Sequence, residues 1–447
     1  MAQAPPTPHT TEAAVGYRQL ISGNRDFRYL WFGQIVSLLG DWFNLIASAA
    51  LITTLTRSGL AVGGLFVVRM LAPFLVSPLA GVLADRYDRR RLLIVTDLAR
   101  AVTVLGFLLV RQAEHVWVLY ALTAVQLAIS GVFFPTRNAI LPDLVSEREL
   151  GAANALSSAT WSVMLALGAA LGGLVAGGWG LYPAFAIDAL TFVASAALLA
   201  QIRTRAQGSL DTSGPAVGAA LRQYVVGLGY LWRQPDILFI VASKGAMGLA
   251  VSGAFEVIQV TLAEQVFVIG EGGSTSLGIL YMTAGVGTGL GPIVARVFTG
   301  DRVRPLRYAL PAAFLVAAAG LLLIAPLTSF GLVLAGGLLR AIGSGVNWVM
   351  ATQLLLLLVP NRVRGRVFAT EFALFTLATA TGAGGVGWLL DRTDLGLGGT
   401  LRLLALLAGL AAGLWLVWLA LGRYRDTPLT PEERSERPGQ VPVEPSH

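Results

Sequence analysis

Residues 60–110 read LAVGGLFVVRMLAPFLVSPLAGVLADRYDRRRLLIVTDLARAVTVLGFLLV, two apolar runs around one basic turn. The runs, residues 60–84 and 92–110, each have the roughly 20 residues that a helix needs to cross a bilayer. Between them lie Arg86 and three consecutive arginines, residues 89–91. Such a cluster stays on the cytoplasmic side, because basic residues near a span oppose its translocation. This stretch predicts a helical hairpin whose turn lies in the cytoplasm.

The composition extends this prediction to the whole chain. Hydrophobic residues make up 55% of the 447 residues and charged ones only 13%, whereas a soluble domain carries about 25% charged residues. A lone span must satisfy its own backbone groups, which favours helices, and the runs are too continuously apolar for barrel strands. We predict an all-α membrane protein with twelve transmembrane helices, near residues 27–55, 60–84, 92–110, 116–134, 150–177, 181–202, 237–267, 277–297, 306–327, 330–359, 367–390 and 401–421.

Basic residues set the orientation of these helices. Most of the 32 basic residues fall in segments that a twelve-span count places on one side of the bilayer, and the arginine-rich side is the cytoplasm. One missed helix would scatter the clusters over both faces. The pattern therefore predicts a multi-pass protein of the cell inner membrane with both termini cytoplasmic. It indicates topology control and contact with membrane lipids, and it argues against nucleic acid as a partner.

The two halves of the chain repeat each other in order. Asp26 matches Asp236, SGV at 130–132 matches SGV at 344–346, and Pro142 matches Pro360, at offsets of 210 to 218 residues. These matches predict two pseudo-symmetric six-helix bundles, an arrangement that encloses a substrate site in many transporters. The expected parts are a cytoplasmic N-terminal tail (1–26), an N-terminal bundle (27–203), a cytoplasmic linker with an amphipathic helix at 221–232 (204–235), a C-terminal bundle (236–422) and a disordered cytoplasmic tail (423–447).

The turn between the second and third spans carries a recognisable pattern. Residues 81–91 read GVLADRYDRRR, which closely resembles the G-x-x-x-D-R-x-x-R-R signature of the major facilitator superfamily. In this reading a glycine permits close helix approach, a carboxylate meets a helix N-terminus and arginines hold the turn at the cytoplasmic face. The matching positions, which the resemblance implies act as a conformational gate, are Gly81, Asp85, Arg86, Arg89 and Arg90.

Three further segments narrow the resemblance to one branch of the superfamily. FPTRNAILPDLV at 134–145, DALTF at 188–192 and VPNRVRGRVF at 359–368 are similar to the third drug–proton antiporter branch, which includes macrolide-efflux and enterobactin-exporter-like proteins. The resemblance covers about residues 20–422. It implies alternating access driven by an ion gradient, usually of protons, and usually outward transport of an apolar or amphipathic compound.

The chain departs from the family at two places. Antiporters of the superfamily often carry G-P-x-x-G-G in the fifth helix, and here GAALGG at 168–173 has alanine where proline would be, which predicts a softer bend. The arginine common in the fourth helix is also missing. By the repeat offset its position is Gln126, while the equivalent position in the tenth helix is Arg340.

Each charged side chain inside a span costs roughly 2.5–3.5 kcal/mol at mid-bilayer on insertion scales, so we expect every such residue to have a structural or functional role. Five acids and four bases nearly cancel, which favours pairing within the protein. Asp97 and Arg100 are spaced i, i+3 and can bridge on one helix. We single out nine such residues: Asp41, Arg69, Asp97, Arg100, Asp188, Lys244, Glu256, Arg340 and Glu371.

Depth in the membrane separates two groups of these charges. Asp97, Arg100 and Glu371 lie within about two turns of the cytoplasmic helix ends. They are expected either to form a latch with the Asp85 turn, which would hold the cytoplasmic side closed, or to take part directly in coupling. Asp41 lies deeper, near the midplane of the first span.

In the family, the first, fourth, seventh and tenth helices line the central cavity. Burial favours the neutral form of a carboxylate, so that a proton can compete with substrate there. Asp41 is the first candidate for proton coupling and Glu256 the second; the alternative for Asp41 is a permanent ion pair with an arginine. Arg340 would either bind an anionic substrate or serve as that partner. The expected cavity residues are Gln126, Arg340, Asn347 and Trp348.

These features predict a secondary active transporter that exports small amphipathic molecules, such as drugs or xenobiotics, by proton antiport. The alternatives are a siderophore or metabolite exporter of the same fold and a non-coupled facilitator or importer. The chain has no cysteine and only three histidines, so we expect no metal and no cofactor, and no nucleophile–base pair suggests an enzyme. The expected partners are a small-molecule substrate, protons as coupling ion and membrane lipids, with a monomeric protein.

Overall fold

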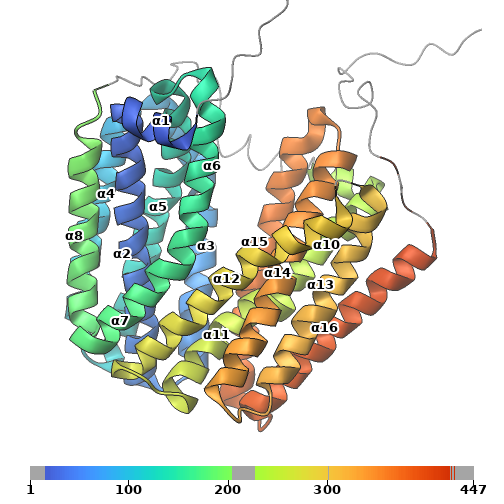
Figure 1. The fold of residues 1–447 in the computed structure, drawn as a ribbon. Helices are drawn as coiled ribbons and strands as arrows, with labels where there is room; N and C mark the ends of the chain where they lie inside the picture. The colour runs from blue at the N-terminus through green and yellow to red at the C-terminus, as the bar shows by residue number, and fades with distance from the viewer. Residues whose placement is uncertain (1–15, 204–226, 301, 423, 425–426, 428–447) are drawn as a thin grey trace, which may run out of the picture.

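The computed structural model describes residues 16–203, 227–300, 302–422, 424 and 427. Every regular element in this part of the chain is helical. Twelve of the helices are long and apolar enough to cross a membrane, which confirms the number predicted from hydropathy. They form two groups, one from each half of the sequence (Figure 1).

The N-terminal half holds six spans, preceded by a short helix. Asn24 begins the first span by accepting a hydrogen bond from the Phe27 N–H at 2.9 Å, as N-cap residues do. The elements are α1 (Tyr17–Gly23), α2 (Arg25–Thr56), α3 (Gly59–Arg86), α4 (Arg89–Leu105), α5 (Val116–Leu144), α6 (Glu147–Val163), the π turn η3 (Met164–Gly168), α7 (Ala169–Trp179) and α8 (Leu181–Leu199).

The C-terminal half repeats this plan. Its first span is interrupted by two π turns, which are rare and frequently mark functional positions in helices. The elements are α10 (Pro235–Met247), the π turn η4 (Gly248–Gly253), α11 (Ala254–Thr261), the π turn η5 (Leu262–Val266), α12 (Ser274–Thr299), α13 (Val303–Ile324), α14 (Phe330–Leu358), α15 (Asn361–Arg392) and α16 (Gly396–Ala420).

The two halves touch along two helix crossings, α3 with α15 and α7 with α12. They meet at the end of the molecule where α7 and α11 lie, and they diverge toward the end that carries α1 (Figure 1). We call these the closed end and the basic end, because the Arg86–Arg91 turn between α3 and α4 belongs to the latter.

Glycines allow the backbones to approach at the closed end. A Cβ on Gly173 of α7 would lie 2.6 Å from the Ser274 carbonyl oxygen and 2.8 Å from the Gly278 Cα of α12. On the other crossing, a Cβ on Gly63 of α3 would lie 2.8 Å from the Ala383 carbonyl oxygen of α15. Small residues at such crossings are what permits tight helix packing within a membrane.

Several helix limits differ from the predicted ones. The fourth span was predicted to end at residue 134, but α5 continues through Pro135 and Pro142 to Leu144, so Arg137 lies inside the bundle. In the fifth span, the π turn η3 ends at Gly168, the first residue of the GAALGG segment, so the helix is irregular there without proline. Of the predicted linker helix, residues 227–232 are helical, and residues 221–226 lie outside the described part.

Candidate functional site

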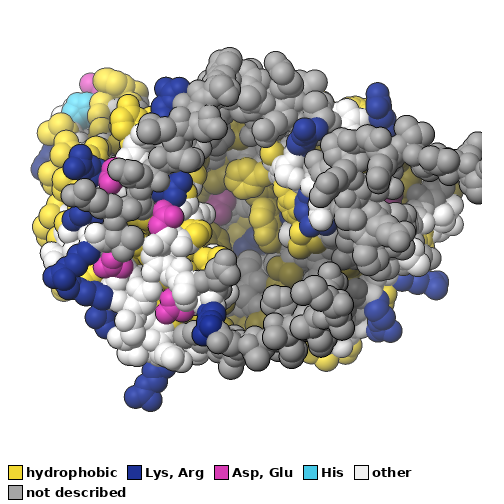
Figure 2. All heavy atoms as spheres, turned by 90° about the horizontal axis from the view of Figure 1, so that it is seen from above, with side chains coloured by type: hydrophobic (Ala, Val, Ile, Leu, Met, Phe, Trp, Pro, Cys, Tyr) yellow, Lys and Arg dark blue, Asp and Glu magenta, His cyan; other side chains and the backbone are white. Residues whose placement is uncertain are grey.

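A hollow opens between the two halves at the basic end. Figure 2 looks onto this end and shows the hollow between the halves, with hydrophobic side chains and a few charged ones in view within it. The charged side chains of the spans form one cluster in the N-terminal half and two in the C-terminal half. These clusters define the candidate site.

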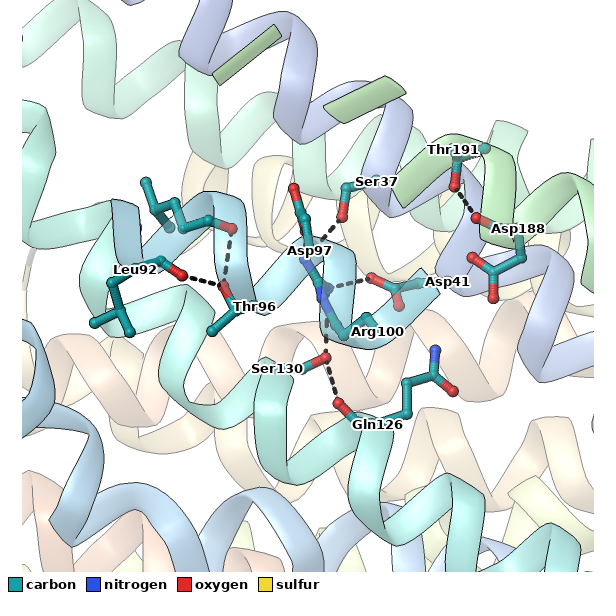
Figure 3. Close-up of polar contacts among 11 residues, drawn as sticks. Ser37, Asp41, Leu92, Thr96, Asp97, Arg100, Gln126, Ser130, Asp188 and Thr191 are labelled. Carbon is teal, nitrogen blue, oxygen red and sulfur yellow. Dashed lines mark hydrogen bonds and ion pairs between the residues drawn. The ribbon is translucent and has the colours of Figure 1, made fainter. Parts of the chain in front are cut away.

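Arg100 of α4 is the centre of the N-terminal cluster. Its guanidinium is fully buried and forms an ion pair with Asp97, as the i, i+3 spacing predicts. It also lies 3.8 Å from the Asp41 carboxylate of α2, and it donates to the hydroxyls of Ser37 (3.3 Å) and Ser130 (3.4 Å) (Figure 3). The Asp41 side chain is 20% exposed, so this cluster reaches the surface of the bundle through Asp41.

Two aromatic rings complete the surroundings of Arg100. The guanidinium carbon lies 4.2 Å from the ring centres of both Phe133 and Phe192. A cation over an aromatic face is stabilised by the quadrupole of the ring, and more so where water is excluded. Phe133 and Phe192 therefore pack on a protein cation in this conformation.

Glu256 of α11 is the centre of the second cluster. Its carboxylate accepts hydrogen bonds from the Gln259 amide (2.7 Å) and the Tyr281 hydroxyl (2.5 Å). Tyr281 of α12 in turn contacts Trp42 of α2, with ring centres 5.3 Å apart. Since Trp42 belongs to the N-terminal half, this chain of contacts connects Glu256 to the boundary between the halves.

Two arginines act on Glu256 from different sides. Arg340 of α14 interacts with it electrostatically, and its guanidinium lies 4.2 Å from the Phe255 ring centre. Arg69 of α3 interacts both with Glu256 and with Asp41. The two proton-coupling candidates thus share Arg69, which lies in the N-terminal half.

The third cluster joins Lys244 of α10 to Glu371 of α15 in a buried ion pair. The ammonium also donates to the Thr352 hydroxyl at 2.7 Å and lies 4.1 Å from the Trp348 ring centre. Glu371 was expected to contact the Asp85 turn or to couple directly. In this conformation it contacts Lys244, within its own half.

The predicted cavity residues differ in their exposure. Trp348 is 40% exposed and packs edge-on against Phe375, with ring centres 4.9 Å apart. Gln126, Asn347 and Arg340 are all buried within the bundles. Of the four, only Trp348 offers a large surface to a ligand in this conformation.

The predicted gate turn is attached to the N-terminal half. Arg89 donates to the Ala139 carbonyl oxygen (3.1 Å) and pairs with Asp143 (2.8 Å), and Arg90 donates to the Ala200 carbonyl oxygen at 2.5 Å. Arg86 is exposed at the end of α3. The side chains of Gly81 and Asp85 lie outside the described part.

Four polar residues of the structure were not among the predicted site residues. Arg137 is buried and donates to Gln34 and Ser157. Arg307 is buried and pairs with Asp236 at 2.5 Å. Both arginines had been counted only among the basic residues that set the orientation of the helices. Glu264 lies in the seventh span, and its carboxyl group faces Thr53 of α2 in the other half. Asp391 contacts the other half, as described in the Discussion.

Two pockets lie outside the charged clusters. The first, of about 460 Å³, lies at the closed end between the two halves and is lined by Thr53, Thr54, Arg57, Glu264, Gln265 and Gly272. The second, of about 540 Å³, is an almost wholly apolar groove on α12, α13 and α14. Among the described residues, no group of three His, Cys, Asp or Glu side chains could hold a metal ion.

Twelve spans in two like halves, with ion pairs buried within each half, are the architecture of a membrane transporter rather than of an enzyme. The chain matches the model of the Major Facilitator Superfamily over residues 30–297, more than half of its length, and it belongs to this family. This confirms the family expected from the GVLADRYDRRR turn.

Curated relatives place the chain near exporters of that family. It is 30% identical over 222 residues to the uncharacterized MFS-type transporter YfiS of Bacillus subtilis, covering 49% of this chain and 52% of that protein. It is 30% identical to the putative bacilysin exporter BacE of Bacillus subtilis (39% and 44% covered) and 27% identical to macrolide efflux protein A of Streptococcus pyogenes (49% and 54%). The chain thus spans about half the length of these relatives.

Solved structures share the fold at low identity. The nucleoside transporter NupG superposes with a TM-score of 0.71 at 11% identity, covering 88% of this chain and 99% of that one. A peptide transporter POT in complex with alafosfalin gives a TM-score of 0.71 at 12% identity, with 91% and 99% covered. These likenesses establish the fold alone.

Proposed function

We propose that this protein exports small amphipathic molecules by proton antiport with alternating access. The observation that carries the proposal is the pair of carboxylates, Asp41 and Glu256, held by arginines close to where the two halves meet. The names of two relatives, a macrolide efflux protein and a putative bacilysin exporter, support export as the direction. A hollow at one end and contact at the other correspond to one of the two states of such a carrier.

The charge arrangement supports competition between proton and substrate. A proton on Asp41 would cancel its attraction to Arg100. The Arg100 guanidinium would then pair with Asp97 alone. A cationic or hydrogen-bonding substrate would in turn favour the ionised carboxylate. The same reasoning applies to Glu256, whose bonds from Gln259 and Tyr281 favour the ionised form.

The placement in the cell follows from the arginine distribution. We propose that the basic end faces the cytoplasm, that both termini lie there, and that the membrane is the cell inner membrane. The domain limits of 27–203 and 236–422 and a monomeric state complete the proposal. The conformation described then has its hollow open to the cytoplasm.

Reconstituted vesicles test the proposal. A dye and drug panel is followed under imposed pH gradients with the wild type, Asp41→Asn, Glu256→Gln and the control Glu271→Gln, which changes an exposed carboxylate at the closed end. We expect the gradient to drive wild-type and control transport, and Asp41→Asn to lose the gradient response while it still equilibrates substrate. Wild-type transport that ignores the gradient would contradict antiport and favour a non-coupled facilitator.

A further inference from the structure

Asp188 of α8 is a fully buried carboxyl group, and neither of its oxygens forms a hydrogen bond of good geometry within the described part of the chain. The nearby Thr191 hydroxyl donates instead to the Asp188 backbone carbonyl at 2.7 Å. The Asn44 amide nitrogen also lies close to Asp188 and has no other hydrogen-bond partner among the described residues. A buried ionised carboxylate would require compensating donors and charges, whereas the side chains that can donate to Asp188 are neutral ones, the Asn44 amide and the Thr191 hydroxyl, and no described base forms an ion pair with it.

The backbone of α2 packs directly on this carboxyl group. A Cβ on Gly40 would lie 2.3 Å from the Asp188 Oδ1 and 2.0 Å from the Thr191 Oγ1, so a larger residue there would have to displace these two side chains. The next residue of α2 is Asp41, and Figure 3 shows its carboxyl group near that of Asp188. The contact therefore brings the buried carboxyl group of Asp188 next to that of Asp41, which is partly exposed.

The charges that face Asp188 do not balance if every group is ionised. They are Asp41 on α2, Arg100 on α4 and Arg69 on α3, and Asp97 on α4 joins this group through its ion pair with Arg100. Arg100 is already paired with Asp97 and faces Asp41, and Arg69 is shared with Glu256 of the other half. Three carboxyl groups thus face two guanidinium groups, and the local charge balances when one carboxyl group is neutral. Of the three, Asp188 alone forms no ion pair within the described part of the chain.

We infer that Asp188 stores the exchangeable proton and that Asp41 relays it to the hollow. This inference rests on the proposed antiport. In the step, the O–H bond of Asp188 breaks and an O–H bond forms on the Asp41 carboxylate, which then gives the proton to water. The negative charge moves to Asp188, and Arg100 can follow it, because its bonds to Ser37 and Ser130 are long at 3.3 and 3.4 Å.

Infrared spectroscopy of the protein in nanodiscs tests where the proton resides. A protonated carboxyl group gives a carbonyl band that an ionised carboxylate lacks. We expect this band in the wild type at neutral pH, its loss in Asp188→Asn, and its retention in the control Thr191→Val, which changes a neighbouring hydroxyl. A wild-type spectrum whose carboxyl bands are unchanged by Asp188→Asn would overturn the inference.

Transport measurements distinguish a role of Asp188 in proton storage from a purely structural role. An amide resembles a protonated carboxyl group in shape and charge, so Asp188→Asn should fold, bind substrate and exchange it across the membrane by counterflow. It should lose transport driven by a pH gradient. Gradient-driven transport that persists in Asp188→Asn overturns the role of Asp188 alone, whereas a wild type without gradient-driven transport overturns the proposed antiport itself. Loss of counterflow with intact substrate binding would also overturn the inference, because a neutral residue should not block exchange.

Discussion

Asp391, at the end of α15, accepts a hydrogen bond from the backbone N–H of Gly59, the first residue of α3, at 2.8 Å. It also accepts one from the Leu60 N–H at 3.0 Å and one from the Ser58 hydroxyl at 2.5 Å. The first N–H groups of a helix have no partner within it and carry a partial positive charge. A carboxylate from the C-terminal half therefore caps a helix of the N-terminal half at the closed end, and this contact must break when that end opens.

Replacing Asp391 with alanine should shift the protein toward opening of the closed end. A carboxylate at a helix N-terminus contributes about 0.3–1 kcal/mol when exposed, and Asp391 is exposed. We therefore expect the ratio of open to closed forms to rise by up to about fivefold. Spin labels at Trp179→Cys and Leu395→Cys, in a chain without native cysteine, would measure the separation of the two halves there.

The matched control for this change is Asp394→Ala. Asp394 is also an exposed carboxylate, three residues further along the chain, but no bond joins it to the cap of α3. An equal shift in both variants would mean that surface charge, and not the cap, sets the equilibrium. High salt should reduce the Asp391 effect, since exposed charges are screened.

Replacing Gly173 with valine should keep the closed end from closing. Even a Cβ at this position would lie 2.6 Å from the Ser274 carbonyl oxygen of α12, and backbone atoms cannot yield as a flexible side chain can. We expect loss of transport with normal membrane insertion, and a wider separation of the same spin labels. The control is Gly178→Ala, also on α7, where a Cβ meets nothing within 4 Å. Full transport by Gly173→Val would show that α7 and α12 need not touch.

The overall fold could be predicted because hydropathy and arginine clusters report directly on membrane crossing. The partners of the buried charges could be predicted only where they share a helix. Asp97 and Arg100 are such a pair, whereas the contact of Lys244 with Glu371 joins α10 to α15 and depends on tertiary packing. Spacing along the chain carries no information about it.

Residues near helix ends were the ones misjudged. Arg137 and Arg307 were counted as topology signals, yet α5 continues past Pro135 and α13 begins at Val303, so both side chains are buried in bundles. The contact of Asp391 was not predicted, because its partner is a helix N-terminus in the other half. Only the packing of the two halves discloses that role.

Replacing Glu371 with glutamine should destabilise the protein strongly. The change leaves the buried Lys244 ammonium without its counter-charge, and breaking a buried ion pair costs about 3–5 kcal/mol. The double variant Lys244→Met with Glu371→Met should recover most of this loss, because apolar side chains replace both charges. Thermal unfolding in detergent would measure all three proteins. A double variant that is as unstable as Glu371→Gln or less stable would show that the unpaired ammonium is not the cause of the loss.

Replacing Trp348 with alanine should weaken binding of aromatic substrates. Trp348 is 40% exposed, and its ring is held between the Lys244 ammonium and Phe375, so its position is fixed before a ligand arrives. Aromatic pairs contribute about 0.5–1.5 kcal/mol beyond area burial, which corresponds to roughly a 2- to 12-fold weaker affinity. Fluorescence titration with aromatic and aliphatic ligands of the panel would measure the affinity.

Two control variants belong to this test. Trp348→Phe should retain most of the affinity, and Trp179→Ala, which removes an exposed tryptophan at the closed end, should retain all of it. Equal weakening for aliphatic ligands would indicate that Trp348 shapes the site through packing on Lys244 rather than by stacking.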